Sequence, residues 1–271
     1  MIVNGATRVY IIVGDPIAQV KAPTGMTQAF AAGGHNAVMI PIHIAPADLA
    51  AFVGAAGRVQ NLDGIIATIP HKFACYKLCS SATERAHFLG TANIMRRAPG
   101  GGWFGEMLDG PGFVGGIRAK GCKPEGARAL LVGAGGAGSA IALGLVDAGV
   151  RELAIHDTDT ARRDTLIGRF AGKFKTPVVA GSSDPSGFDL IANATPAGMK
   201  PGDPFPVAVD RLMPNMFVGC VITAPAVSPI VAAAQKIGCK TSVGGDMYDA
   251  AQQLMLDFLL AGPKARGGYV I

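Results

Sequence analysis

Three glycines and one aspartate have the types and spacing that bind a dinucleotide. Residues 130–138 form a short apolar run that ends in Gly-x-Gly-x-x-Gly, with the glycines at 133, 135 and 138. A strand, a tight turn and a helix in this order bring backbone N–H groups against a pyrophosphate. The next apolar run, residues 151–156, ends at Asp157, where a carboxylate would accept hydrogen bonds from ribose hydroxyls. A Gly-rich run alone indicates only a turn, but the strand, helix and acid together favour a nicotinamide or flavin nucleotide.

Hydride chemistry on an alcohol also needs a group that takes the hydroxyl proton and stabilises the developing alkoxide. Lys72 is a candidate because it follows a buried apolar strand at residues 64–68, and side chains at the carboxyl ends of such strands can face a ligand. A solvated surface lysine is the alternative. Asp109 begins the segment Asp-Gly-Pro-Gly-Phe and is a second candidate, although it could equally cap the helix that follows.

Strand and helix patterns alternate along the whole chain and would position these residues. Strands are expected at residues 9–13, 37–42, 64–68, 91–95, 102–105, 151–156, 177–180, 190–193, 217–222 and 240–243. Helices are expected at residues 24–32, 46–56, from 70 onward, and at 112–120, 139–148, 158–170, 227–237 and 248–260. The alternation predicts an α/β fold of two domains with parallel-type sheets and a ligand cleft between them.

Composition argues against several classes of function. With 271 residues, 49% of them hydrophobic and 16% charged, the chain can form a large core, and its length suggests about two domains. The net charge of +5 is scattered without a basic stripe, so we expect no nucleic-acid partner. The five cysteines lack paired metal-ligand spacing, so we expect no metal and expect Cys75 and Cys79 to be reduced thiols on a helix. No apolar run is long enough to span a membrane, and we expect a cytoplasmic protein without a membrane partner.

Six short motifs, in one order along the chain, resemble those of the shikimate dehydrogenase family. They are Gly14-Asp15-Pro16-Ile17, Thr68-Ile69-Pro70-His71-Lys72, Gly90-Thr91-Ala92-Asn93, Asp109-Gly110-Pro111-Gly112-Phe113, Gly133–Gly138 and Asn193-Ala194-Thr195-Pro196-Ala197-Gly198-Met199. The resemblance runs from about residue 9 to about residue 261. It implies an N-terminal α/β substrate-binding and catalytic domain, residues 1–109, completed by a C-terminal helix at 246–271. It also implies a Rossmann-type, doubly wound nucleotide-binding domain at residues 110–245.

The resemblance further implies roles for single residues. The lysine and aspartate that match Lys72 and Asp109 form the catalytic pair in this family, and the asparagine that matches Asn93 helps to hold the substrate hydroxyls, near Thr68. The implied cofactor contacts are Gly133, Ala134, Gly135, Gly136, Ala137, Gly138, His156, Asp157, Thr158, Asn193, Ala194, Thr195, Pro196, Met199, Val221 and Gly245.

The implied protein is an oxidoreductase, a monomer or homodimer. It would transfer hydride between NAD and a secondary alcohol of a small cyclic hydroxy acid or polyol, like shikimate or quinate. An inactive nucleotide-binding sensor or regulator is the alternative. Retention of both Lys72 and Asp109 favours the enzyme.

The substrate segment departs from the family pattern. Two serines that hold the shikimate carboxylate in the family fall on Val20 and Ala22, and a tyrosine falls on Thr223. Lys21 is the only charged side chain in the segment, and it either turns inward to pair with a carboxylate or stays in solvent. Each lost hydrogen bond to a carboxylate removes about 1.5–3 kcal/mol of binding. We therefore expect poor use of shikimate itself.

Two further positions near the expected site also differ or stay open. The asparagine and threonine that precede the catalytic aspartate in the family are Met107 and Leu108 here. The glutamine of the last helix corresponds to Gln252 or Gln253, and the sequence does not fix which one serves.

The tripeptide His156-Asp157-Thr158 predicts the choice of cofactor. Family members that prefer NADP usually have Asn-Arg-Thr here, and the arginine pairs with the 2′-phosphate. A carboxylate at this place repels that phosphate and accepts hydrogen bonds from a free ribose diol, so we expect NAD. Arg162 and Arg163 follow closely, so use of NADP stays open.

Overall fold

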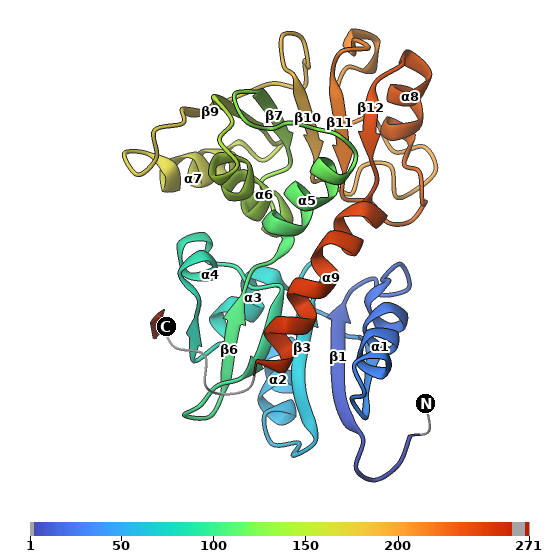
Figure 1. The fold of residues 1–271 in the computed structure, drawn as a ribbon. Helices are drawn as coiled ribbons and strands as arrows, with labels where there is room; N and C mark the ends of the chain where they lie inside the picture. Colours follow the sequence, from blue (N-terminus) through green and yellow to red (C-terminus); the bar gives the residue numbers. More distant parts are fainter. Residues whose placement is uncertain (1–2, 262–268, 271) are drawn as a thin grey trace. The chain divides into compact units, whose positions relative to one another are not determined.

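The computed structural model describes residues 3–261 and 269–270. The chain divides into two compact units, Met1–Leu108 with Gln252–Ile271, and Asp109–Ala251 (Figure 1). The chain thus enters the second unit at residue 109, where the sequence suggested residue 110. It returns at residue 252, within helix α9 (Gly244–Leu260), where the sequence suggested residue 246.

The first unit is built on a mixed sheet with the order β13-β4-β6-β5-β3-β1-β2. Its strands are β1 (Arg8–Gly14), β2 (Ala37–His43), β3 (Leu62–Ala67), β4 (Ser81–Ala82), β5 (Ile94–Arg97), β6 (Trp103–Glu106) and β13 (Tyr269–Val270). Strand β1 is parallel to β2 and β3, whereas β5 is antiparallel to both β3 and β6. The expectation of a parallel-type sheet therefore holds for β1, β2 and β3, and it is wrong for β5, which makes the sheet mixed. The glycine run at 100–102 reverses the chain between β5 and β6, and strands joined by so short a turn pair antiparallel.

The helices of the first unit follow its strands and bury their apolar residues against the sheet. They are α1 (Ala22–Ala32), α2 (Leu49–Ala56), α3 (Lys72–Lys77) and α4 (Glu84–Leu89), together with the end of α9. Ile11, Val13, Leu49, Ile65 and Met95 belong to one buried core cluster. Among the described helices of the chain, none combines the length and hydropathy that a membrane span needs.

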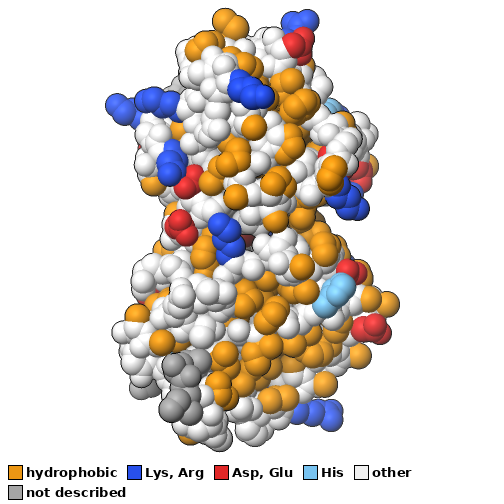
Figure 2. Space-filling model, turned by 90° about the vertical axis from the view of Figure 1, so that its right-hand side faces the viewer, with side chains coloured by type: hydrophobic (Ala, Val, Ile, Leu, Met, Phe, Trp, Pro, Cys, Tyr) orange, Lys and Arg blue, Asp and Glu red, His pale blue; other side chains and the backbone are white. Residues whose placement is uncertain are grey.

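Strand β2 is an edge of this sheet, and its outer side is protected. The Met39 N–H donates to Thr27 Oγ1 of α1 at 3.0 Å, and Pro41 has no N–H to offer. Both features hinder the addition of another strand. Figure 2 views the first unit from its α1 side, where apolar side chains gather on the surface, and Ile40 of β2 is 41% exposed.

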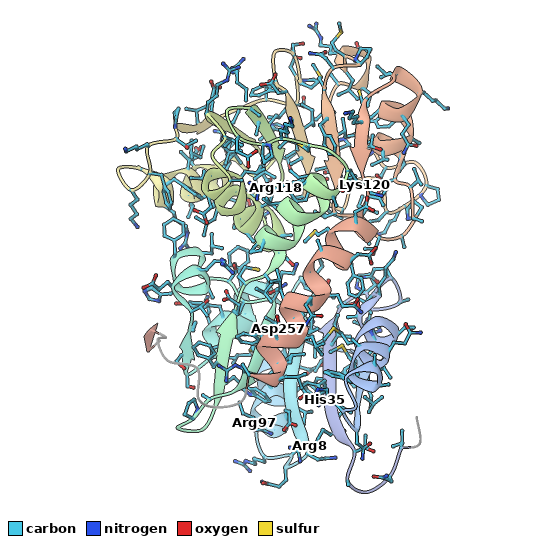
Figure 3. All side chains as sticks on the ribbon, in the orientation of Figure 1. Arg8, His35, Arg97, Arg118, Lys120 and Asp257 are labelled. Carbon is cyan, nitrogen blue, oxygen red and sulfur yellow. The ribbon has the colours of Figure 1, made fainter. Side chains whose placement is uncertain are left out.

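Arg97 ties the end of α2 to the sheet (Figure 3). Its guanidinium donates to the carbonyls of Gly57 and Val59, both at 2.6 Å, and to Leu62 at 2.9 Å. It also lies over the Trp103 ring, 4.5 Å from the centroid. One planar donor group thus joins the segment after α2 to the start of β3.

The second unit contains a fully parallel sheet with the order β12-β11-β10-β7-β8-β9. Its strands are β7 (Arg128–Val132), β8 (Glu152–His156), β9 (Val178–Ala180), β10 (Leu190–Asn193), β11 (Phe217–Cys220) and β12 (Lys240–Ser242). Numbered along the chain and read from β9, the order is 3-2-1-4-5-6, which is the Rossmann arrangement. The expected fold class is confirmed for this unit.

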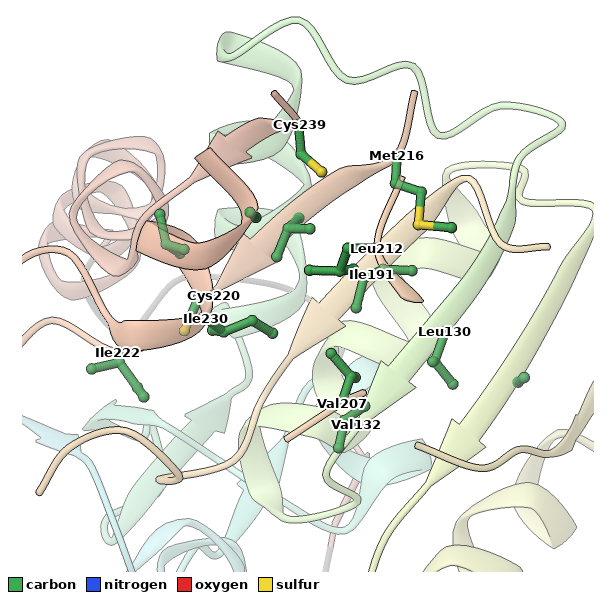
Figure 4. Close-up of a cluster of buried hydrophobic side chains, with 14 residues drawn as sticks. Leu130, Val132, Ile191, Val207, Leu212, Met216, Cys220, Ile222, Ile230 and Cys239 are labelled. Atoms are coloured by element: carbon green, nitrogen blue, oxygen red, sulfur yellow. The ribbon is translucent and has the colours of Figure 1, made fainter. Parts of the chain in front are cut away.

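Helices and a short 3₁₀ turn accompany this sheet. They are α5 (Asp109–Ala119), α6 (Gly136–Asp147), α7 (Thr160–Phe170), α8 (Pro229–Ile237) and the turn at Val209–Arg211. Buried side chains of β7, β10, β11 and α8 form a continuous apolar core, drawn in Figure 4. Leu130, Ile191 and Val218 supply its centre, and each is fully buried. The strands that carry the expected nucleotide site at their carboxyl ends are therefore rigidly supported.

Candidate active site

The Gly-rich turn connects β7 to α6 in the way that the sequence predicts. Gly133 has φ +102°, a backbone conformation that favours glycine. A Cβ on Gly138 would lie 1.8 Å from the Gly133 carbonyl oxygen, so no larger residue fits there. Helix α6 begins at Gly136, with Gly135 as its N-cap, and its first N–H groups provide positive partial charge for an anion.

This turn lies beside the turn that follows β10. A Cβ on Gly133 would be 2.9 Å from Thr195 Cγ2 and 3.0 Å from the Ala194 carbonyl carbon. Strands β7 and β10 are neighbours in the sheet, at the point where the strand order reverses. In open parallel sheets, ligands bind outside the carboxyl ends of the strands at that point. The structure thus brings together the residues predicted at 133–138 and those at 193–196.

Asp157 holds the Gly-rich turn through its carboxylate. Its Oδ2 accepts a hydrogen bond from Ala134 N at 2.7 Å, and its Oδ1 accepts one from Asp159 N at 2.8 Å. The residue is 9% exposed. We expected this carboxylate to serve ribose hydroxyls, and a nucleotide would have to share it with these two backbone donors. His156 beside it is half-buried, and Thr158 is exposed.

The two arginines after β8 have different partners. Arg162 Nη2 lies 2.9 Å from Asp159 Oδ2, and Arg162 Nη1 lies 3.8 Å from Asp157 Oδ2. Arg163 Nε instead pairs with Asp164 Oδ1 at 2.8 Å. Arg162 is therefore the cation that accompanies the Asp157 carboxylate, and about half of its side chain is exposed.

The remaining predicted cofactor residues also lie in the second unit. Val221 is half-buried at the end of β11, and its N–H donates to the Asn193 carbonyl at 3.1 Å. Met199 N–H donates to the Pro196 carbonyl at 3.0 Å, within the turn after β10. Gly245 is buried in the first turn of α9.

In the first unit, the turns after β1 and β3 are joined by backbone hydrogen bonds. Thr68 N–H donates to the Val13 carbonyl, and Asp15 N–H donates to the Ile69 carbonyl, both at 2.9 Å. Thr68 is half-buried at the carboxyl end of β3. Two of the sequence motifs therefore form one folded edge of the mixed sheet.

Lys72 is held in place by its neighbours on both sides. His71 is 1% exposed, and its Nε2 lies 2.9 Å from the Ile44 carbonyl oxygen, which can only accept. The Lys72 carbonyl accepts from Ala92 N at 3.0 Å. Lys72 begins α3 and is half-buried, so it is not the fully solvated surface lysine of the alternative interpretation.

Asn93 connects this region to the chain just before Asp109. Its side-chain Oδ1 accepts from Leu108 N at 2.9 Å, and its carbonyl accepts from Ala67 N at 2.7 Å. The expected role of Asn93 was to hold substrate hydroxyls, yet one side of its amide fixes the backbone. Asp109 is 7% exposed and lies within the first turn of α5.

The segment with the altered substrate contacts leads into helix α1, whose first residue is buried and apolar. Ala22 is buried as the first residue of α1, and Val20 is half-buried. Lys21 is exposed, at the N-cap position of the same helix. Thr223 is half-buried in the second unit, after β11.

Helix α9 distinguishes its two glutamines. Gln253 is exposed, and its Nε2 donates to Asp257 Oδ1 at 2.7 Å, one turn along the helix; Asp257 is labelled in Figure 3. Gln252 is half-buried. Gln252 is therefore the better candidate for a substrate contact.

Met107 and Leu108, which stand where the family has an asparagine and a threonine, are both buried apolar residues. They pack in the interior of the unit and offer no side-chain hydrogen bond to a substrate.

Sequence reasoning missed two polar residues of the second unit, Cys220 and Ser228. Both are 1% exposed, and the Ser228 hydroxyl donates to Cys220 Sγ at 3.2 Å. The spacing of this cysteine from the others matches neither a metal site nor a disulfide, so the sequence does not mark it as functional. The helix was expected at residues 227–237, which includes Ser228, but nothing in that pattern predicts a contact with a thiol.

Comparison with known proteins agrees with this geometry. Residues 12–95 match the model of the shikimate dehydrogenase substrate binding domain. A shikimate dehydrogenase (NADP(+)) from a Geobacter species is 36% identical over 261 residues, which cover 92% of this chain and 89% of the relative.

Two solved structures cover nearly the whole chain. The ligand-free 5-ketofructose reductase of a Gluconobacter species is 26% identical, with a TM-score of 0.79 and coverage of 94% of this chain and 93% of that one. The quinate dehydrogenase from Corynebacterium glutamicum, in complex with NAD, is 25% identical, with a TM-score of 0.81 and coverage of 97% and 96%.

The fold and the site together define the class of protein, an α/β oxidoreductase with a Rossmann-type nucleotide-binding unit. The level of identity and the coverage make the assignment specific. The chain belongs to the shikimate dehydrogenase family.

Proposed function

We propose that the chain is an NAD(P)-dependent dehydrogenase that acts on a secondary alcohol of a small, polyhydroxylated cyclic substrate. The observation that carries this proposal is the Gly-rich turn packed against the Asn193–Thr195 turn at the reversal of the strand order, on a chain that keeps Lys72 and Asp109. A bound nicotinamide would accept the hydride from the alcohol carbon. The backbone at residues 133–138 and the start of α6 fit a pyrophosphate, because Gly133 and Gly138 permit the close packing that shapes the turn, and nothing lies within 4 Å of a Cβ built on Gly135.

The chain's own residues handle the proton. The Lys72 ammonium or amine hydrogen-bonds the substrate hydroxyl, and the hydroxyl proton moves toward Asp109 or water as the alkoxide forms. Asn93 helps to orient the substrate hydroxyls, and its Oδ1 keeps the backbone at Leu108 fixed, one residue before Asp109. Because the backbone beside Asp109 is already fixed, little conformational entropy is lost when this carboxylate takes part in the reaction.

We further propose NAD as the preferred cofactor, with NADP also accepted. The support is the Asp157 carboxylate at the end of β8, which disfavours a 2′-phosphate. Arg162 partly offsets that charge and makes NADP use feasible. The Geobacter relative is named for NADP(+) and the Corynebacterium enzyme is in complex with NAD. The measurement is kcat/KM with each cofactor, and a higher value with NADP would contradict the preference.

We propose that the substrate carries no carboxylate at the position where shikimate has one. Val20 and Ala22 offer no hydroxyl donors, and the one cation of the segment, Lys21, is exposed. The likeness to the 5-ketofructose reductase favours a neutral keto-sugar or polyol over a quinate-like acid, because 5-ketofructose has no carboxylate.

The test is a substrate panel in which shikimate, quinate and neutral cyclic polyols are supplied with NAD⁺ or NADP⁺, and 5-ketofructose is supplied with NADH or NADPH. The readout is the rise of the reduced cofactor's absorbance with the alcohols and its fall with the ketone. We expect a shikimate KM well above the micromolar-to-millimolar range that is usual for enzymes. The double substitution of Val20→Ser with Ala22→Ser should lower that KM, and Lys21→Ala, which changes the exposed neighbour only, is the matched control. Efficient shikimate oxidation by the unmodified chain would refute the pocket assignment. Tight nucleotide binding without turnover of any compound would favour a sensor.

A further inference from the structure

A chain of buried hydrogen bonds supports the turn that follows β10. Asn193 Nδ2 donates to Cys220 Sγ at 3.3 Å. Asn193 Oδ1 accepts from Thr195 N at 3.0 Å and from Thr195 Oγ1 at 2.7 Å. The Ser228 hydroxyl donates to the same sulfur at 3.2 Å. The thiol of Cys220, at the end of β11 and labelled in Figure 4, thus connects the start of α8 to the turn.

Ser228 makes this contact in place of an ordinary helix cap. It occupies the N-cap position of α8, where a serine oxygen usually accepts a hydrogen bond from an N–H in the first turn. Its side chain makes no such cap bond. The hydroxyl donates to Cys220 Sγ instead, so it contributes to holding the sulfur rather than the helix.

Two neighbours hold opposite ends of the Asn193 amide. The two ends of a carboxamide differ, because the oxygen accepts and the nitrogen donates. The Thr195 backbone N–H can only donate, so it takes the oxygen end, which also accepts from the Thr195 hydroxyl. Asn193 is fully buried, and Cys220 Sγ accepts from the NH₂ end. Without the sulfur, the buried NH₂ group loses this acceptor, and the amide is held through its oxygen end alone.

The Thr195 turn is in direct contact with the Gly-rich turn. Thr195 Cγ2 lies 2.9 Å from the position that a Cβ on Gly133 would occupy, and Thr195 Oγ1 also accepts from Ala197 N at 3.2 Å. An Asn193 amide held at one end only would fix Thr195 less firmly and loosen the surface on which Gly133 packs. The effect of the thiol therefore extends to the nucleotide-binding edge of the sheet.

We propose that Cys220 is a positioning residue for the nucleotide site: it fixes the Asn193 amide, and through it the Thr195 turn. The proposal rests on the proposed binding of NAD(P). Cys220 is 1% exposed and acts through Asn193, not by contact with the nucleotide. Its substitution should thus weaken nucleotide binding while leaving kcat at saturating nucleotide unchanged.

The experiment compares Cys220→Ala with Cys220→Ser in the full chain. Alanine and serine have nearly the same size, but only serine keeps a hydrogen-bond acceptor. Binding is measured by titration with NADH and NADPH, read by their fluorescence. We expect Cys220→Ala to raise the Kd about five- to tenfold and Cys220→Ser to stay within about twofold of the unmodified chain. Cys239→Ala is the matched control, because Cys239 is a buried thiol of the same unit whose Sγ donates to the Met213 carbonyl at 3.2 Å.

The outcomes separate the two proposals. Unchanged affinity in Cys220→Ala would overturn the positioning role, and so would equal weakening in Cys220→Ala and Cys220→Ser, because lost volume would then be the cause. If Cys220→Ala does not fold, Cys220→Val, which fills the space without an acceptor, replaces it with the same expected loss. If the unmodified chain binds neither NADH nor NADPH, the proposed function fails before any substitution is made.

Discussion

Asp157 has two separable roles, and Asp157→Ala and Asp157→Asn distinguish them. The carboxylate accepts from Ala134 N and from Asp159 N, and Ala134 is 1% exposed. Alanine would leave the Ala134 N–H buried without this acceptor, and a lost hydrogen bond to a charged group is worth about 1.5–3 kcal/mol. The Asp159 bond is only part-buried, so we count it at about 0.5 kcal/mol. We therefore expect Asp157→Ala to lower the free energy of unfolding by about 2–3.5 kcal/mol.

Asp157→Asn keeps an oxygen acceptor and removes the charge. We expect it to lose less than about 1.5 kcal/mol of stability, because only the charge-dependent part of the bond disappears. Both variants should reduce the preference for NAD over NADP, since the repulsion of a 2′-phosphate is gone. The assays are urea denaturation and the ratio of kcat/KM for the two cofactors.

The matched control for this pair is Asp159→Ala. Asp159 caps α7 by accepting from Arg162 N at 3.0 Å and pairs with the Arg162 side chain, but it has no bond to the Gly-rich turn. Its loss should lower stability by about 1 kcal/mol, as for other helix caps. If Asp157→Ala is no less stable than Asp159→Ala, the carboxylate does not hold the turn. If Asp157→Asn retains the full cofactor preference, charge is not its basis.

Three further outcomes follow from single contacts. Lys72→Ala should lower kcat by about 10²–10⁴, the usual effect of losing a general acid–base group, and leave the Kd for NAD unchanged; Lys77→Ala, in the exposed last turn of the same helix, should have no effect. Arg97→Ala should lower the free energy of unfolding by about 1–2 kcal/mol in a denaturation assay, because three part-buried or exposed carbonyls lose a charged donor, and Arg97→Lys should recover only part of it. Burial raises the pKa of the Cys75 and Cys79 thiols to about 12, so neither should react with a thiol reagent at pH 8 in the folded protein, and fast labelling of either would contradict their burial.

The sequence predicts best those elements whose residues are apolar and whose ends are marked by turns. Strand β10 has the expected bounds, because the run Leu190–Asn193 is apolar and the turn with Pro196 follows it. Strand β5 was expected at residues 91–95 and lies at Ile94–Arg97. Its second half is two arginines, which look solvent-exposed in the sequence. Arg96 is 3% exposed because its guanidinium lies against the Phe104 and Phe258 rings, a contact that no local pattern reveals.

The same limit applies to the site. The glycines at 133 and 138 were predictable because each answers a local steric demand within one turn. The contacts of Cys220 were not, since its partners Asn193 and Ser228 are 27 and 8 residues away in the chain. Helix α9 begins at Gly244 instead of residue 248, because tertiary packing overrides the low helix propensity of two glycines. The short elements β4 and α4 carry too few residues to show a period.

Helix α9 has a consequence for the order in which the protein can fold during its synthesis. The second unit is one continuous stretch, Asp109–Ala251, and all of it is translated before the residues of α9 that belong to the first unit. The first unit needs both ends of the chain. Phe258 stacks on Phe104 with ring centroids 5.9 Å apart and helps to enclose Arg96, and Leu259 is 4% exposed. The N-terminal sheet therefore waits, with a side of its core uncovered, while the whole second unit is translated. The unit that begins the chain is the last to be completed, and a nascent chain held before residue 258 would be a natural substrate for chaperones.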